Sequence, residues 1–263
     1  MRIALCQITS GPGPDANAAL VNRYTAEAAD AGARVVVFPE ATMARFGVPL
    51  ASIAEPVNGP WARRVGGIAD RHGVLVVAGM FTPAPNGRVF NTLLATGCGQ
   101  HRWYHKIHLY DAFGFAESRT VAPGDDLVVL RVDDLNLGLA TCYDVRFPRL
   151  FQELADRGAA AVLLPASWGA GEGKREQWEL LVRARALDST SWVLACDQAD
   201  PHMLGNEVSG TAPTGIGWST VADPFGRVHA QLGGEPGILV VDIEQDVADE
   251  ARKTIAVLNN RKM

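Results

Sequence analysis

Three side chains with the chemistry of a nucleophilic site each stand at the end of a short run that is typical of a strand. Cys142 ends the run LGLAT, Glu40 ends the run VVVFP and Lys106 ends the run HRWYH. Ligands and reacting groups gather at the carboxyl ends of strands in α/β sheets, so we expect the thiol, the carboxylate and the amine to lie together. Their combination predicts hydrolysis through a covalent intermediate.

Cys142 is the expected nucleophile. The residues after it, Tyr143 to Pro148, predict a tight turn that opens a helix. Because a helix N-terminus favours negative charge, we expect it to lower the pKa of the thiol. Cys142 would attack a carbonyl carbon and form a thioester, which water then cleaves. The alternative for a lone cysteine is a small buried hydrophobic residue, but the Tyr-Asp-x-Arg-Phe-Pro sequence favours the nucleophile.

Glu40 and Lys106 have complementary expected roles. Glu40 would act as general base, taking the thiol proton, protonating the departing ammonia and then activating the water. The Lys106 ammonium and the backbone N–H of Tyr143 would stabilise the oxyanion of the tetrahedral intermediate. The alternatives are a capping or surface carboxylate and a solvent-exposed lysine. Four apolar residues and a proline precede Glu40, and apolar residues surround Lys106, which favours the catalytic roles.

The elements that must position these residues alternate between βα units and β-hairpins, which predicts mixed sheets covered by helices, an α/β fold. Helices are predicted over 15–32, 60–72, 147–157, 174–188 and from about residue 244, with Asp15 as a possible N-cap and Gly32 as the stop of the first. Strands are predicted over 2–8, 34–39, 74–81, 88–96, 100–106, 127–132, 136–142, 160–164, 191–197, 214–222, 227–232 and 237–242. Segments 121–125 and 209–213 are predicted loops within a single domain over 1–263.

Composition excludes several classes of partner. The 263-residue chain is 48% hydrophobic and 20% charged, with a net charge of −5, so a nucleic-acid or anionic-membrane partner is not expected. No signal peptide and no membrane-spanning stretch is evident, which favours a cytoplasmic protein. Cys6, Cys98 and Cys196 show no CxxC spacing and are expected to be reduced. His105 and His108 lack an acidic partner at ligand spacing, so no metal and no cofactor is expected.

Three sequence blocks together resemble a known family. VVVFPE around Glu40, YHKIHLYD around Lys106 and GLATCYDVRFP around Cys142 are similar, in this order, to the signature blocks of the nitrilase superfamily of carbon–nitrogen hydrolases. The first strand, the Asn91-Thr92 pair and the helix around 183–186 also match, so the resemblance covers nearly the whole chain. It implies a four-layer α-β-β-α sandwich and a homo-oligomer built on a dimer.

The resemblance also implies further site residues. Glu117 matches the fourth residue of the family site, a glutamate that hydrogen-bonds the lysine and helps to place the substrate amide; the loop before it is shorter than in omega-amidases. Trp178 corresponds to a family tryptophan beside the pocket, with a core aromatic as an equal alternative. Asn91 is expected to satisfy backbone groups near the site, and Asp144 and Arg146 are expected to pair and hold the turn.

The YDVRFP form resembles the branch that contains omega-amidases and deaminated-glutathione amidases, which cleave the terminal amide of small carboxylate-bearing compounds. Segment 166–178 departs from that branch and places Gln177 where a histidine is usual. Arg146, Lys174 and Arg175 flank the expected pocket and could bind a substrate carboxylate. Lys174 and Arg175 could instead begin a solvent-exposed helix. The expected substrate is therefore a small linear amide with a carboxylate a few atoms away.

Other functions remain open at this point. The same three residues serve nitrilases and N-carbamoyl amine hydrolases, and products from an amide, a nitrile and an N-carbamoyl amine separate these activities. A non-catalytic binding protein on the same fold is a different class, and the intact Glu40, Lys106 and Cys142 argue against it. A redox-sensing thiol protein would need a resolving cysteine near Cys142, which the local sequence lacks.

Overall fold

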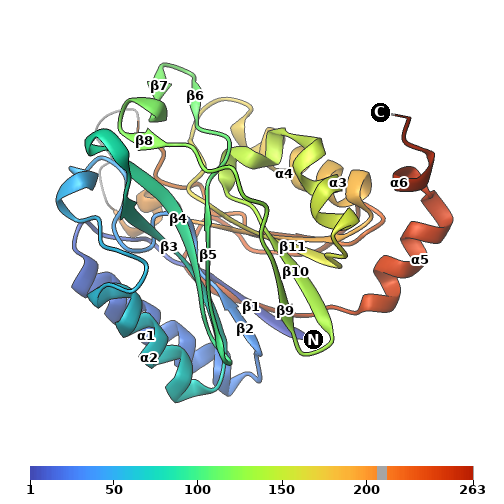
Figure 1. Cartoon of the computed structure of the whole chain (residues 1–263), viewed down its shortest axis with the longest axis horizontal. Coiled ribbons are helices and arrows are strands. Elements are labelled where there is room, and N and C mark those ends of the chain that lie inside the picture. The colour runs from blue at the N-terminus through green and yellow to red at the C-terminus, as the bar shows by residue number, and fades with distance from the viewer. Residues whose placement is uncertain (206–211, 263) are drawn as a thin grey trace.

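Two β-sheets lie face to face in the computed structural model, and helices cover their outer faces (Figure 1). The structure describes residues 1–205 and 212–262. The seven-stranded sheet has the order β15-β1-β2-β3-β4-β5, with β8 paired to β4. Its strands are β1 (Arg2–Gln7), β2 (Val35–Val37), β3 (Leu75–Pro83), β4 (Val89–Gly97), β5 (Gln100–His105), β8 (Val121–Ala122) and β15 (Gly237–Asp242).

The second sheet has six strands in the order β14-β13-β12-β11-β10-β9. Its strands are β9 (Val129–Val132), β10 (Leu135–Leu139), β11 (Ala161–Ala166), β12 (Trp192–Asp197), β13 (Thr220–Ala222) and β14 (Val228–Gln231). A small hairpin of β6 (Asp111–Ala112) and β7 (Phe115–Ala116) stands apart from both sheets. Short 3₁₀ helices lie at η1 (Leu50–Ser52), η2 (Pro85–Gly87), η3 (Glu117–Arg119), η4 (Cys142–Arg146) and η5 (Pro201–Leu204).

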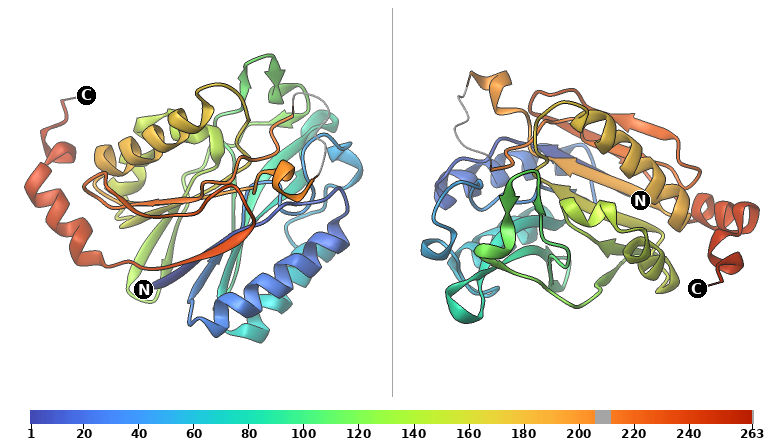
Figure 2. Two further views of the ribbon diagram at one scale, coloured as in Figure 1. Left: turned by 180° about the vertical axis from the view of Figure 1, so that it is seen from behind. Right: turned by 90° about the horizontal axis from the view of Figure 1, so that it is seen from above.

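The helices complete four layers. The first sheet is covered by α1 (Pro14–Asp30) and α2 (Pro60–His72), and the second by α3 (Pro148–Asp156) and α4 (Lys174–Ser189). Figure 2 shows that α5 (Gln245–Ile255) and α6 (Val257–Asn260) extend away from these layers at the C-terminal end. None of the helices within the described ranges has the length and apolar character that a bilayer crossing needs. The expected α-β-β-α sandwich is confirmed.

Alternation along the strands builds the layers. In β1, Ile3 and Leu5 belong to the core between the two sheets, whereas Ala4 and Cys6 belong to the core under α1 and α2. Side chains of successive strand residues point to opposite faces, so a strand that is buried on both faces must be apolar throughout. This is why the central strands have nearly continuous runs of valine, leucine and alanine.

Several boundaries differ from the sequence predictions. The strand predicted over 214–222 is wrong for most of its length, since only Thr220–Ala222 pairs as β13. Asp15 does not cap the first helix: Gly13 is its N-cap, and the Asp15 carboxylate pairs with Arg64 at 2.6 Å. The segment 121–125, predicted as a loop, contains β8, and part of the loop predicted at 209–213 lies outside the described residues.

Strand directions bring the ends of β2, β5, β10 and β11 to one edge of the sandwich. β2 runs parallel to β3, and β5 has the same direction because both β3 and β5 are antiparallel to β4. In the second sheet β10, β11 and β12 are parallel. The backbone N–H of Ser167, after β11, donates to the Glu40 carboxylate, after β2, at 2.8 Å. The carboxyl ends of strands from both sheets therefore meet at this edge of the sandwich.

Gly79 of β3 provides a test of how tightly the Glu40 segment is packed. A Cβ at position 79 would lie 2.5 Å from Ala41 N and 2.9 Å from Glu40 Cα. We expect Gly79→Ala to displace this segment, lower stability by about 1–3 kcal/mol and reduce catalytic activity. Gly67→Ala in α2 is the matched control, since a Cβ there meets nothing within 4 Å. It should stabilise the helix by roughly 0.5–1 kcal/mol.

Thermal unfolding of both variants, together with activity assays, checks this expectation. A Gly79→Ala protein that unfolds at the wild-type temperature would contradict the close approach of the two backbones.

Candidate active site

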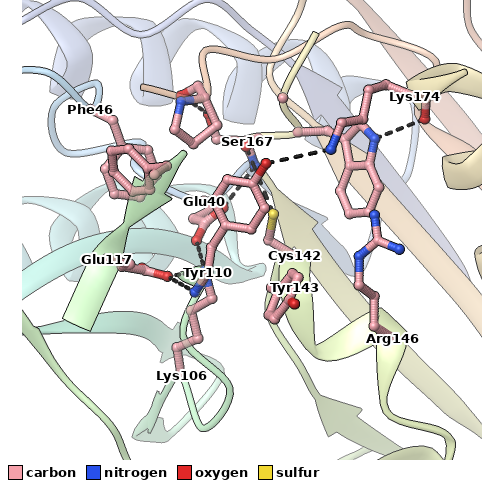
Figure 3. A pocket seen from close by; sticks show the side chains of 14 residues that line it. Glu40, Phe46, Lys106, Tyr110, Glu117, Cys142, Tyr143, Arg146, Ser167 and Lys174 are labelled. Atoms are coloured by element: carbon pink, nitrogen blue, oxygen red, sulfur yellow. Dashed lines mark hydrogen bonds and ion pairs between the residues drawn. The ribbon is translucent and has the colours of Figure 1, made fainter. Parts of the chain in front are cut away.

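A buried lysine shared by two buried carboxylates forms the centre of the site. The Nζ atom of Lys106 lies 2.9 Å from Glu40 Oε1 and 2.9 Å from Glu117 Oε2, and each of the three side chains is at most 2% exposed. Lys106 directly follows β5, Glu40 follows β2, and Glu117 begins η3. Figure 3 shows the lysine reaching between the two carboxylates.

The carboxylate oxygens of this ion cluster also accept hydrogen bonds from three further segments. Asn91 Nδ2, on β4, donates to Glu40 Oε1 at 2.7 Å and to Glu117 Oε1 at 3.0 Å. Glu40 Oε2 accepts from Ser167 N at 2.8 Å, and Glu117 Oε2 accepts from Tyr110 N at 2.7 Å. The expectation that Asn91 satisfies backbone groups is wrong, because it bridges the carboxylates. Glu117 has both oxygens engaged in holding its neighbours.

The electrostatics of the cluster are suited to a general base at Glu40, because they raise the pKa of its carboxyl group. Burial raises the pKa of Glu40; Lys106 opposes this shift and the negative charge of Glu117 adds to it. Burial alone would lower the pKa of Lys106, but Glu117, Glu40 and the nearby Cys142 together raise it well above its usual range. Two carboxyl groups share one ammonium, so the cluster has one acidic group more than it has basic groups. A carboxylate with a raised pKa and a fixed position suits proton transfer.

Cys142 begins η4 in a left-handed backbone conformation, with φ of +46°. This conformation is costly for a residue with a Cβ and is typical of functional positions. The side chain is 6% exposed, and its Sγ lies 3.7 Å from the carbonyl oxygen of Ser167. In Figure 3 the sulfur lies beside Glu40.

The expectation that a helix N-terminus lowers the pKa of Cys142 is wrong. Burial raises the pKa of this thiol well above its usual value, the charge of Glu40 adds to the increase, and Lys106 only partly opposes it. The helix that begins here is a 3₁₀ helix of five residues, too short to outweigh burial. The thiol therefore keeps its proton in the free protein, and a base is needed to remove it.

Asp144 ties the turn of the cysteine to the segment around the lysine. Its carboxylate accepts from Thr141 N at 2.8 Å, from the Tyr104 hydroxyl at 2.7 Å, and from His108 N and Nδ1 at 3.0 and 2.7 Å. Asp144 is fully buried, so these donors are what make an unsolvated carboxylate tolerable. The expected pairing of Asp144 with Arg146 is wrong.

A pocket opens onto the sulfur and the ion cluster. It combines the acidic and thiol groups at one end with aromatic rings and two cations elsewhere. Its lining residues are Glu40, Phe46, Lys106, Tyr110, Phe115, Glu117, Cys142, Tyr143, Arg146, Ser167, Trp168, Gly169, Lys174 and Pro213. Aromatic walls with a few polar groups are typical of a site for a small molecule.

Two cations line the pocket without an acidic partner among the described residues. Arg146 Nη2 donates to Gln177 Oε1 at 2.8 Å, and its guanidinium carbon lies 5.2 Å from the centre of the Trp168 ring. Lys174 Nζ lies 3.4 Å from the Tyr110 hydroxyl and is 8% exposed as a residue. Burial and the charge of Arg146 lower the pKa of Lys174. The alternative of a solvent-exposed Lys174 is therefore wrong.

Arg175 and Trp178 are not among the described residues that line the pocket. Arg175 pairs with Glu179 at 3.0 Å, packs over the Trp218 ring, and has a 48% exposed side chain, as expected for the surface of a helix. Trp178 is fully buried and donates from Nε1 to the Trp218 carbonyl at 2.9 Å. It is a core aromatic on the buried face of α4.

Sequence reasoning missed two residues that help to build the site, Ser167 through its backbone N–H and Asp197 through its carboxylate. Ser167 follows β11 and supplies its N–H to Glu40. Asp197 ends β12 and accepts from Trp168 N at 2.7 Å and Ile216 N at 2.9 Å; burial raises its pKa to about 8. The only signal in the sequence was the place of Ser167 and Asp197 at the ends of two further predicted strands.

Over the described ranges, no three His, Cys, Asp or Glu side chains form a candidate metal-ligand set.

Comparisons with known proteins agree on one family. A family model described as carbon-nitrogen hydrolase matches residues 2–253. The chain is 58% identical over 267 residues to a hydrolase of Mycobacterium tuberculosis, covering 99% of this chain and 95% of that protein. It is 33% identical over 254 residues to the deaminated glutathione amidase of Escherichia coli O157:H7, covering 94% and 91%. The solved NitN amidase of Nesterenkonia sp. AN1 is 28% identical, with a TM-score of 0.82 over 100% of this chain and 96% of that one.

The raised pKa of Cys142 predicts how its reactivity depends on pH. Because only the thiolate reacts, alkylation of Cys142 by iodoacetamide should keep increasing through pH 9 without a plateau. Glu40→Gln removes the neighbouring charge that disfavours the thiolate, so the profile should move to lower pH. Peptide mapping after timed alkylation between pH 6 and 10 measures both.

Cys98, which is partly exposed and lies outside the pocket, provides the internal control, because Glu40→Gln should not alter its profile. A plateau for Cys142 below pH 8 would instead mean that a thiolate is already paired with Lys106 in the free protein.

Proposed function

The chain belongs to the carbon-nitrogen hydrolase family, and we propose that it is an amidase that hydrolyses a small linear amide to a carboxylic acid and ammonia through a thioester. The observation that carries the proposal is the placement of the Cys142 sulfur in a small pocket beside the buried pair of Glu40 and Lys106. The relatives named amidases support the reaction class.

In the first half of the reaction, Glu40 removes the proton from the Cys142 thiol and the sulfur attacks the amide carbon. The Lys106 ammonium and the N–H of Tyr143 stabilise the negative charge that develops on the carbonyl oxygen. The protonated Glu40 then passes its proton to the nitrogen as the C–N bond breaks. Ammonia leaves, and the acyl group remains on the sulfur as a thioester.

In the second half, a water molecule replaces ammonia beside Glu40. Glu40 takes a proton from the water, which attacks the thioester carbon, and the same lysine and N–H stabilise the second tetrahedral intermediate. The C–S bond breaks, the sulfur recovers a proton from Glu40, and the acid leaves. One water molecule is consumed for each amide bond cleaved, and Glu40 returns to its initial state.

Glu117 acts mainly by holding the lysine. Its Oε2 accepts from Lys106 and from Tyr110 N, and its Oε1 accepts from Asn91. Two carboxylates on one ammonium keep that ammonium protonated, so it remains a donor to the oxyanion and does not take part in proton transfer. Glu117 then helps to place the substrate amide only indirectly, because it fixes the position of Lys106.

We propose that the substrate carries a carboxylate a few atoms from the amide. Arg146 and Lys174 line the pocket without an acidic partner among the described residues, and a carboxylate would supply one. Of the cations expected from the sequence, Arg175 does not line the pocket and is not part of this proposal. The relative named deaminated glutathione amidase supports a carboxylate-bearing substrate, as its name implies such a compound.

A matched set of substrates tests this function. We expect a five-carbon ω-amide with a terminal carboxylate to be hydrolysed with a kcat/KM about tenfold or more above that of its neutral methyl ester, because a charge-assisted contact contributes roughly 1.5–3 kcal/mol. The corresponding nitrile and N-carbamoyl amine should be poor substrates. Ammonia release measures the reaction, and Cys142→Ala is the inactive control.

Preference for the nitrile or the N-carbamoyl amine would replace the amidase assignment with one of these two activities. Absence of turnover on every amide, nitrile and N-carbamoyl compound would favour the non-catalytic binding protein. Higher kcat/KM for neutral amides would refute the carboxylate while leaving the thioester mechanism in place.

We further propose that the chain is a single domain of 263 residues that works in the cytoplasm as a homodimer or a higher homo-oligomer, without a cofactor and without nucleic-acid or membrane partners. Light scattering at micromolar concentration should give at least twice the 28.1 kDa mass of one chain. A 28.1 kDa species alone under these conditions would refute the pairing.

A further inference from the structure

Gln177 lies directly behind the pocket arginine. It occupies the first turn of α4, and its Oε1 accepts from Arg146 Nη2 at 2.8 Å. This hydrogen bond is made by a neutral amide, so it fixes the guanidinium without cancelling its charge. The Nε atom of Arg146 is buried and has no partner among the described residues.

The other neighbours that the described residues provide to the two pocket cations are also neutral. The guanidinium carbon of Arg146 lies 5.7 Å from the centre of the Tyr143 ring and 5.2 Å from the centre of the Trp168 ring. Lys174 Nζ lies 3.1 Å from the Phe113 ring centre and 3.4 Å from the Tyr110 hydroxyl. Aromatic faces and a hydroxyl stabilise a cation without neutralising it. Two positive charges therefore remain available at this end of the pocket.

An acidic residue at position 177 would change this balance. A carboxylate at the place of the Gln177 amide would form a charge-assisted pair with Arg146, which already points a donor at that position. The pair would satisfy the guanidinium and would repel a substrate carboxylate at close range. The amide at position 177 thus maintains the positive charge that the site presents.

We propose that Gln177 is the positioning residue that sets the preference of this site for a negatively charged substrate group, by orienting Arg146 while leaving the combined charge of Arg146 and Lys174 uncompensated. The proposal rests on the proposed amidase function and deepens it. The ligand class is a carboxylate at the end of a short chain, whose other end lies at Cys142. Gln177 acts through Arg146 and does not take part in bond making.

Gln177→Glu tests the proposal because it keeps the shape of the side chain and adds one negative charge. We expect KM for the ω-carboxylate amide to rise by about tenfold or more while kcat changes less than about threefold, as loss of uniform binding predicts. The kcat/KM for the neutral methyl ester should stay within about threefold of the wild-type value. Gln177→Met, which removes the hydrogen bond without adding charge, should have a smaller effect on KM.

Gln152→Glu is the matched control. Gln152 lies on α3, where its Nε2 donates to the Asp188 carbonyl at 3.5 Å, and it does not line the pocket. This substitution adds the same charge to the protein and should leave both substrates unaffected. An equal loss of kcat/KM on the charged and neutral substrates in Gln177→Glu would mean a structural role only, and an unchanged preference would also overturn the proposal.

A binding measurement separates this proposal from the amidase function. Glutarate, a short dicarboxylate, is titrated calorimetrically into the Cys142→Ala protein with and without Gln177→Glu. We expect the second substitution to weaken glutarate binding by about tenfold or more. This result would support the carboxylate site even if no amide were hydrolysed, whereas equal affinities, or no binding to Cys142→Ala alone, would overturn the proposal.

Discussion

The interaction on which the site depends is the Lys106 ammonium shared between the buried carboxylates of Glu40 and Glu117. Removing such charges from water costs several kcal/mol for each ion, so the arrangement is stable only with close pairing and further hydrogen bonds. Those bonds come from Asn91 on β4 and Ser167 after β11, which belong to different sheets. The packing of the two sheets against each other therefore also fixes the position of the Glu40 carboxylate.

The same burial controls the reactivity of the sulfur. Burial of Cys142 disfavours its thiolate, and burial of Glu40 raises the pKa of that carboxyl group. Burial thus favours the protonated thiol of Cys142 next to a carboxyl group whose affinity for a proton has increased. A strained backbone at Cys142, tied through Asp144 to the segment around the lysine, keeps the sulfur in place.

Charge is distributed unevenly along the pocket. The end that contains the thiol has two acidic side chains, which share one lysine. The other end carries Arg146 and Lys174, whose described neighbours are aromatic rings, a hydroxyl and the Gln177 amide. A molecule with a neutral amide at one end and an anionic group at the other would be oriented by this gradient before any contact specific to the reaction is made.

The sequence by itself determined the α/β class, most helices and strands, and the three polar residues at strand ends, because apolar periodicity and local turn signals are encoded over a few neighbouring residues. Only the tertiary structure decided which partners those side chains have. Asp144 accepts from the lysine segment and not from its neighbour Arg146, while Lys174 turns into the pocket and Arg175 turns to the surface. Ser167 reaches Glu40 across 127 residues of chain. These choices depend on burial and on the register of strands in two sheets, which no local pattern contains.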